Sequence, residues 1–183
     1  MKKSPLKSKK VSESFTIMSE IVLPNDTNTL QNLMGGKLMH WMDITAAIVS
    51  QKHCNRPCVT VSVDHVHFHN PIQLGNIVTI EGKITRTFNS SLEIYLSVYS
   101  ENPIQNEKYL SNEAFFNFVA LDSLGKPTLV PEIIPETEQE KVMYEDAFQR
   151  RQLRLLLAGK LHYEDEMKLK DLLFPKFKKS NPK

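Results

Sequence analysis

The chain has 183 residues, 40% of them hydrophobic, and a formal net charge of +2. This length and apolar content are enough for one ordinary domain with terminal extensions, and they argue against two domains. The basic N-terminal segment is not followed by an apolar run, and no stretch is long enough to span a bilayer, so we expect neither a secretory signal nor a membrane span. We therefore expect a soluble protein in the cytoplasm.

The apolar pattern predicts one strand, one helix and then a run of strands. A first strand is expected over residues 14–22. Apolar residues surround the whole helical circumference over residues 37–53, which is typical of a helix buried on most sides. The later strands, which alternate with period two or are rich in aromatic and β-branched residues, are expected over residues 58–68, 77–88, 91–99 and 109–121. This order predicts an α+β domain in which one helix packs on a face of an antiparallel sheet.

The C-terminal third is expected to be helical. Thr137 and Glu140 have the spacing of a capping box, which predicts a helix that begins there. An amphipathic segment over residues 162–174 suggests another helix. We therefore divide the chain into a domain over residues 12–136 and a helical extension over 137–174. Lysine-rich, mobile tails are expected over residues 1–11 and 175–183.

One carboxylate stands out in the predicted core helix. Asp43 lies among apolar residues in "NLMGGKLMHWMD", after the paired glycines Gly35 and Gly36. A buried carboxylate is costly unless it is paired or used, so Asp43 is a candidate general base. The alternative is an aspartate at a solvated helix edge or bonded to a backbone amide.

Several linked motifs resemble one known family. They are "LPNDTN", "NLMGG", "WMDITAAIVSQKHC" and "VTVSVDHVHFHNPIQLGNIVTIEGKI", followed by "TFNSSLEI" and "FVALDSLGKPTLVP". Together they are similar to the hotdog-fold acyl-CoA thioesterases over about residues 15–154. The resemblance implies a hotdog fold, in which an antiparallel sheet wraps around one long central helix. It also implies hydrolysis of acyl-CoA to a free acid and coenzyme A, with no cofactor beyond the coenzyme A of the substrate.

The resemblance also implies roles for residues around the glycine pair. Thioester hydrolysis needs a carboxylate to activate water or attack directly, and hydrogen-bond donors for the developing oxyanion. Asp43 would be the base or nucleophile, Asn32 would position water or the carbonyl, and the Gly36 N–H would bind the oxyanion, with Gly35 beside it. A glycine pair before a helix is also common in a simple sharp turn.

The helix rise separates these residues within one chain. Asp43 lies seven residues beyond Gly36, or about 10 Å along a helix, and Asn32 precedes the helix. We therefore expect Asn32 and Gly36 of one subunit to face Asp43 of another across a two-fold axis. The family also has sites between paired hotdog units, so we predict a homodimer or a trimer of dimers.

Coenzyme A is polyanionic, so cations should line its site. Arg150, Arg151 and Arg154 cluster on the predicted C-terminal helix, and Ser90 and Ser91 match a small polar pair of the family. The alternative for any single arginine is a solvated surface charge. The candidate substrate-binding residues are Gly35, Arg86, Ser90, Ser91, Arg150 and Arg151.

Two groups of side chains raise the question of a metal site. Cys54 and Cys58 lack the second pair that a zinc finger or ribbon requires, so we expect reduced thiols. His65, His67 and His69 recur with period two and should share one strand face, as metal ligands do in some β-structures. The opposite face is expected to hold Asp64, Val66 and Phe68. They occupy positions that vary in the family, so we interpret them as outward or interface residues and predict no metal.

Other functions remain possible from the residues alone. A non-catalytic acyl-CoA sensor on the same fold, with basic tails for nucleic acid or a membrane surface, is the main alternative. No helix-turn-helix pattern precedes the sheet, and Asn32 with Asp43 favours hydrolysis, so we expect no nucleic-acid partner. A hotdog hydratase would need a catalytic histidine in a different motif beside Asp43.

Overall fold

The computed structural model describes residues 6–160, with the exception of the His65 side chain. The predicted helix over residues 162–174 and the predicted tail over 175–183 lie outside this part of the chain. A five-stranded antiparallel sheet has the strand order β2-β4-β5-β6-β3. Its strands are β2 (Thr16–Ile21), β3 (Cys58–Phe68), β4 (Ile77–Thr87), β5 (Ser91–Asn102) and β6 (Glu107–Ala120). The five predicted strands are confirmed, and β5 extends three residues further than expected.

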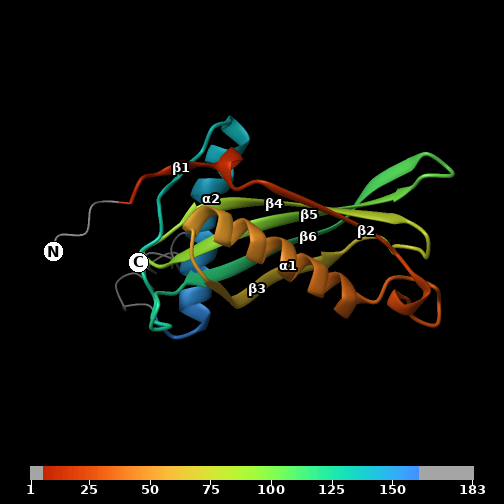
Figure 1. Cartoon of the computed structure of the whole chain (residues 1–183), viewed down its shortest axis with the longest axis horizontal. Coiled ribbons are helices and arrows are strands. Elements are labelled where there is room, and N and C mark those ends of the chain that lie inside the picture. Colours follow the sequence, from red (N-terminus) through yellow and green to blue (C-terminus); the bar gives the residue numbers. More distant parts are fainter. Residues whose placement is uncertain (1–5, 161–183) are drawn as a thin grey trace, which may run out of the picture.

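Two helices of equal length cover opposite faces of this sheet (Figure 1). α1 (Gly35–Cys54) contacts all five strands, and α2 (Glu138–Leu157) contacts β4 on the other face. The predicted helix over residues 37–53 is confirmed, and the Thr137–Glu140 capping box begins α2 as expected. The hotdog arrangement is therefore present: a sheet curves around the central helix α1.

The apolar core lies between α1 and the sheet. Val78, Ile80 and Ile84 alternate along β4 and are almost fully buried, and buried residues of β5 and β6 extend the same face. Gly82 lies in this row because a Cβ there would be only 2.9 Å from Val49 Cγ2 of α1. The missing side chain thus lets α1 approach the centre of the sheet closely.

The N-terminal segment departs from the prediction of a mobile tail. Lys9–Lys10 form strand β1, which pairs in parallel with β7 (Ile133–Ile134). The Lys9 ammonium donates to the Lys52 carbonyl at 2.9 Å, near the C-terminal end of α1, where a cation is electrostatically favourable. The expectation of a tail over residues 1–11 is therefore wrong for these two lysines, because their backbone and charge have specific partners.

Within residues 6–160, no helix combines the length and the apolar content needed to cross a membrane.

Candidate active site

The loop before α1 is anchored by a buried aspartate. One Asp26 carboxylate oxygen lies 3.1 Å from the Lys37 ammonium, and the other accepts the Leu23 N–H at 3.1 Å. These two bonds, with Lys37 first, lower the pKa of Asp26. The Lys37 ammonium also lies 5.5 Å from the centre of the Trp41 ring. Asp26 therefore fixes the loop against the first turns of α1.

Asn28 and Asn32 of this loop are joined by two hydrogen bonds, one to the Asn28 side chain and one between backbone groups. The Asn28 side-chain oxygen accepts the N–H groups of Leu30 at 2.9 Å and Asn32 at 3.1 Å. The Asn28 N–H in turn donates to the Asn32 carbonyl at 2.8 Å. The Asn28 side chain is exposed, and its NH₂ group has no acceptor among the described residues. Asn28 thus presents an NH₂ donor whose orientation is fixed by these bonds. Asn32, the residue predicted from the sequence, lies four residues later and is half-buried.

The N-terminus of α1 is open. Gly35 and Gly36 are exposed, and no side chain in the described part of the chain caps this helix end. The ring of Phe68 would lie 3.5 Å from a Cβ at Gly35, whereas a Cβ at Gly36 would meet nothing within 4 Å. Free N–H groups at the positive end of a helix are suited to bind an anion. Both glycines are therefore candidate donors, and Gly36 has more open space around its Cα.

Asp43 lies further along α1 and is bonded to β3. Its Oδ1 accepts a hydrogen bond of 2.6 Å from the Thr60 hydroxyl. Its Oδ2 has no partner among residues 6–160. Asp43 is half-buried because β3 is an edge strand, so this side of the helix is only partly covered. The pair therefore holds one carboxylate oxygen in place and leaves the other available.

An apolar surface adjoins this pair. Ile44 and Ile48 lie one turn apart on α1. On β3, Val61 lies at a bulge next to Thr60, whereas Val59 alternates with Thr60 and faces the other side of the sheet. All four side chains are substantially exposed, Val61 to 55%. Because β3 pairs only with β6 among the described strands, its other edge offers free backbone groups beside these residues.

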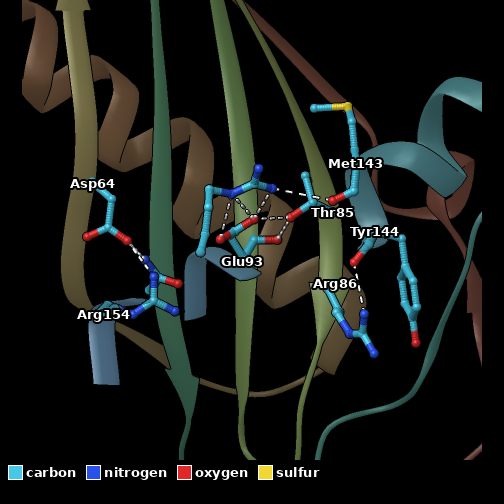
Figure 2. A network of polar contacts seen from close by, with 9 residues as sticks. Asp64, Thr85, Arg86, Glu93, Met143, Tyr144 and Arg154 are labelled. Atoms are coloured by element: carbon cyan, nitrogen blue, oxygen red, sulfur yellow. Dashed lines mark hydrogen bonds and ion pairs between the residues drawn. The ribbon is translucent and has the colours of Figure 1, made fainter. Parts of the chain in front are cut away.

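The arginines predicted to bind phosphate make contacts between α2 and the sheet. Figure 2 shows the contact of Arg86 with Tyr144 of α2. Arg150 contacts the fully buried Glu93 carboxylate at 2.8 Å, and Arg86 donates to the Tyr144 carbonyl at 3.0 Å. The Arg151 guanidinium lies 4.5 Å from the centre of the Phe88 ring. Their partners are protein groups of the same chain, so the structure gives these arginines a role in packing.

Ser90 lies in the turn between β4 and β5, and Ser91 is the first residue of β5. Ser91 pairs with Val119, which pairs with Val59, the neighbour of Thr60. A cavity of about 700 Å³ adjoins this turn. Its lining includes Thr87, Phe88, Asn89, Tyr144 and Arg56. Arg56, which is not among the predicted binding residues, thus places a positive charge in the lining of this cavity.

The histidines do not follow simple alternation. A β-bulge between Asp64 and His67 shifts the register, so both residues lie opposite β6 residues of one face, Phe115 and Glu113. His67 and His69 stack with ring centres 5.6 Å apart, and His69 lies 3.9 Å from Glu113. The expectation that these histidines and Asp64 occupy opposite faces is therefore wrong. No group of three potential ligands among the described residues is arranged to hold a metal ion.

Comparison with known proteins identifies the family and the fold. Residues 30–106 match the thioesterase superfamily. The chain is 41% identical over 138 residues to the uncharacterized acyl-CoA thioester hydrolase YkhA of Bacillus subtilis, covering 75% of this chain and 80% of the relative. This chain belongs to the hotdog-fold acyl-CoA thioesterases.

Solved structures of this family superimpose on almost the entire described chain. An apo-hexameric acyl-CoA thioesterase matches with a TM-score of 0.81 and 40% identity, over 84% of this chain and 98% of its own. An acyl-CoA hydrolase of Staphylococcus aureus, solved with butyryl coenzyme A, coenzyme A and coenzyme A disulfide, matches with a TM-score of 0.78 and 33% identity, over 91% and 99% of the two chains. That hydrolase was also solved with an aspartate, a threonine or an asparagine replaced by alanine.

The structure adds two residues, Asn28 and Thr60, to the candidate site that the sequence analysis did not select. Thr60 appeared only as a strand residue, because nothing local indicates that β3 places its hydroxyl against Asp43. Asn28 was read as part of the motif "LPNDTN" without a role, although an asparagine before a turn commonly bonds nearby backbone N–H groups. That preference was the available signal for Asn28.

Proposed function

We propose that this thioesterase hydrolyses acyl-CoA to a carboxylic acid and coenzyme A, with Asp43 as the reacting carboxylate. The Asp43–Thr60 pair carries this proposal. A threonine hydroxyl that holds Oδ1 at 2.6 Å orients the carboxylate and leaves Oδ2 for water or the thioester carbon. An aspartate at a merely solvated helix edge would not need such a partner.

Each step has a group to perform it. As water attacks the carbonyl carbon, Asp43 takes its proton, and the negative charge on the carbonyl oxygen is stabilised by the Gly36 N–H. The C–S bond then breaks, and the coenzyme A thiolate receives the proton from Asp43. In the nucleophilic route, Asp43 attacks the carbonyl carbon, the C–S bond breaks and coenzyme A leaves as a thiolate. Water then hydrolyses the acyl-aspartyl anhydride, which releases the acid, regenerates the Asp43 carboxylate and supplies the proton to the thiolate.

We assign the carbonyl-positioning amide to Asn28 or Asn32. Asn32 is the residue expected from the sequence, whereas the exposed NH₂ group of Asn28 has an orientation set by two backbone bonds. The residues replaced in the S. aureus hydrolase have the types and the sequence numbers of Asn28, Thr60 and Asp43 here. This agreement favours Asn28.

The active form proposed here is a two-fold pair joined along β3. Seven residues of helix, about 10 Å, separate Gly36 from Asp43, so one chain does not bring both to one carbonyl. Pairing two β3 edges would cover the exposed Ile44, Ile48 and Val61 and bring a second α1 close to Asp43. Three such pairs would form the trimer of dimers expected from the sequence.

For coenzyme A we propose the cavity beside Ser90 and Ser91. Arg56 supplies a positive charge for a phosphate there, and Asn89 and Thr128 supply polar side chains, with Glu132 as the acidic residue of the lining. Arg56→Gln is therefore expected to raise KM for acyl-CoA more than it lowers kcat.

Thiol release from acyl-CoAs of increasing chain length tests the main proposal. Asp43→Asn should abolish most of the release, and Thr60→Val should reduce it about tenfold or more, because a hydrogen bond to a charged group is lost. Asp146→Asn, a change of an exposed aspartate on α2, is the matched control. Equal rates for the wild type and Asp43→Asn would overturn the proposal and favour an acyl-CoA sensor.

Subunit mixing tests the shared site. Asp43→Ala mixed with Asn28→Ala, or with Asn32→Ala, should regain activity after subunit exchange, since some pairs then contain one intact site. Whichever asparagine variant is inactive alone and is rescued by mixing identifies the positioning amide. Absence of rescue in both mixtures contradicts a site built from two subunits.

Single turnover in ¹⁸O-labelled water tests the nucleophilic route. Label in the Asp43 carboxylate requires an anhydride that water opens at the aspartyl carbon, because a general base directs all of the label to the product acid.

A further inference from the structure

A bulge in β3 turns the side chain of Phe68 toward the α1 side of the sheet. Asp64 pairs with Phe115, whose ring lies against α2, and simple alternation would place Phe68 on that same face. The bulge that follows Asp64 shifts the register, so Phe68 pairs instead with Asn112. Asn112 pairs in turn with Val98, which is fully buried in the core under α1. Bulges are common next to active sites, where they change the direction of a side chain.

The ring of Phe68 lies against the N-terminus of α1. Its Cε1 and Cζ atoms would be 3.5 Å from a Cβ at Gly35, which is van der Waals contact, so the ring packs on the first residue of the helix. Phe68 is nevertheless 58% exposed. An apolar surface is therefore open to solution beside the free N–H groups of Gly35 and Gly36.

Hydrogen bonds fix the ring relative to this end of the helix. The segment that follows Phe68 runs beside the loop that precedes α1. The Leu33 N–H donates to the Ile72 carbonyl at 2.7 Å. The Leu74 N–H donates to the Gln31 carbonyl at 2.9 Å. Because the loop leads directly into α1, these bonds hold the end of β3 and the start of the helix in one arrangement, so the position of the ring is preorganised.

We propose that Phe68 is a specificity-determining residue, whose open ring surface contacts the acyl chain of the substrate. This inference rests on the proposed function, in which the Gly36 N–H binds the carbonyl oxygen of acyl-CoA. An oxygen bound there places the carbonyl carbon, and the acyl carbons attached to it, beside the end of the helix. On the other side of the carbonyl, the sulfur leads into the polar amide groups of coenzyme A. The apolar ring therefore matches the acyl side, and their contact removes apolar surface of both groups from water.

Thiol release by the full chain from acetyl-, butyryl- and hexanoyl-CoA tests this contact. Phe68→Ala should lower kcat/KM for hexanoyl-CoA about tenfold relative to acetyl-CoA, the effect of removing apolar contact from about two methylene groups. Phe68→Leu keeps part of the apolar surface and should give an intermediate ratio. The matched control is Phe15→Ala, which removes a phenylalanine of 38% exposure just before β2, at the opposite edge of the sheet from β3. The control should keep the ratio of the wild type.

The ratio between substrates separates this contact from a structural role. A variant that is only destabilised loses activity toward all three substrates in proportion, so its ratio stays at the wild-type value. Urea unfolding of each variant measures the free energy of unfolding independently. If Phe68→Ala does not fold, the same comparison with Phe68→Leu decides.

Each result supports or overturns the contact. A ratio that falls in the Phe68 variants and not in Phe15→Ala supports it. An unchanged or raised ratio in the Phe68 variants, or an equal fall in the control, overturns it and leaves the proposed function in place as long as the wild type hydrolyses the substrates. A wild type that releases thiol from none of the three substrates overturns both the proposed function and the role of Phe68.

Discussion

The two helices illustrate two ways of attaching a helix to one sheet. α1 and α2 each have 20 residues, yet α1 buries nine side chains and α2 only Ala147. α1 is held by continuous apolar contact, where each large buried side chain contributes about 1.5–3 kcal/mol. α2 is held by a few charged and aromatic contacts on the opposite face. A helix with few buried side chains, such as α2, is therefore still attached to the sheet.

The polar attachment of α2 depends on satisfying a buried charge. Glu93 is fully buried, accepts the Thr85 hydroxyl at 2.6 Å and contacts Arg150 (Figure 2). The Arg150 guanidinium also lies 3.9 Å from the centre of the Phe115 ring. Breaking such a pair from one side leaves an uncompensated charge, which costs more than the pair itself contributes. The α2 face is therefore sensitive to single substitutions.

The largest effect expected is on catalysis, from the α1 face. Asp43→Asn should lower kcat/KM for acyl-CoA about 1000-fold, the size of a lost acid–base group, while the unfolding transition changes little. Thiol release and thermal unfolding measured on the same preparation check this. A loss of stability as large as the loss of activity would contradict a purely chemical role.

Arg150→Met tests the α2 face and should destabilise the protein by about 3 kcal/mol, because Glu93 loses its charged partner. Urea unfolding measures the change. The matched control is Arg154→Met, which should cost about 1 kcal/mol because its partner Asp64 is 20% exposed. Replacing Glu93 together with Arg150 by apolar residues should recover much of the stability. If Arg150→Met raises KM for acyl-CoA and leaves the free energy of unfolding unchanged, the phosphate-binding role expected from the sequence is supported instead.

Gly82→Ala tests the close packing of α1. The added Cβ would meet Val49 at 2.9 Å and Leu96 at 3.0 Å, so overpacking should destabilise the protein by about 2 kcal/mol. Gly36→Ala is the control for stability, because nothing lies within 4 Å of its Cβ and alanine favours a helix. Similar unfolding midpoints for the two variants would argue against tight contact at Gly82.

The smallest effect expected is a pH dependence from His53. This side chain is fully buried, with one ring nitrogen 2.9 Å from the Pro131 carbonyl, and burial lowers its pKa below the ordinary 6.5. The nearby Lys9 charge also lowers it, and Glu13 opposes this. The unfolded chain binds the proton more readily, so stability should be complete above pH 6.5 and decline as the pH falls below it.

Urea unfolding of the wild type and His53→Gln between pH 5 and 8 measures this effect, where the range brackets the ordinary histidine pKa. Glutamine keeps a donor for the Pro131 carbonyl but does not titrate, so its stability should lack this component of the pH dependence. Identical slopes for both proteins would assign the effect to other groups.

Several features were predictable because their signals are local. The alternation of β3 and β4, the apolar circumference of α1 and the Thr137 capping box each depend on neighbours within a few residues. The linked motifs around Asp43 were sufficient to indicate the family. Thr60, by contrast, is 17 residues from Asp43, and no local pattern connects them.

The arginines also show that a local pattern does not reveal a contact partner far away in the sequence. Their clustering and charge suited a phosphate site, but Glu93, 57 residues before Arg150, lies beneath α2 and binds Arg150. The bulge between Asp64 and His67 likewise changed which side chains share a face, and an inserted residue in a ladder is visible only once the partner strand is known.

For this protein, the sequence by itself determined the order of elements and the thioesterase family, and it selected Asp43 as a candidate. Only the tertiary structure decided that the Thr60 hydroxyl bonds to this carboxylate and that α2 is attached by charged residues. Periodicity and motifs are properties of neighbouring residues, whereas these contacts join residues whose proximity depends on the turns and strand register between them.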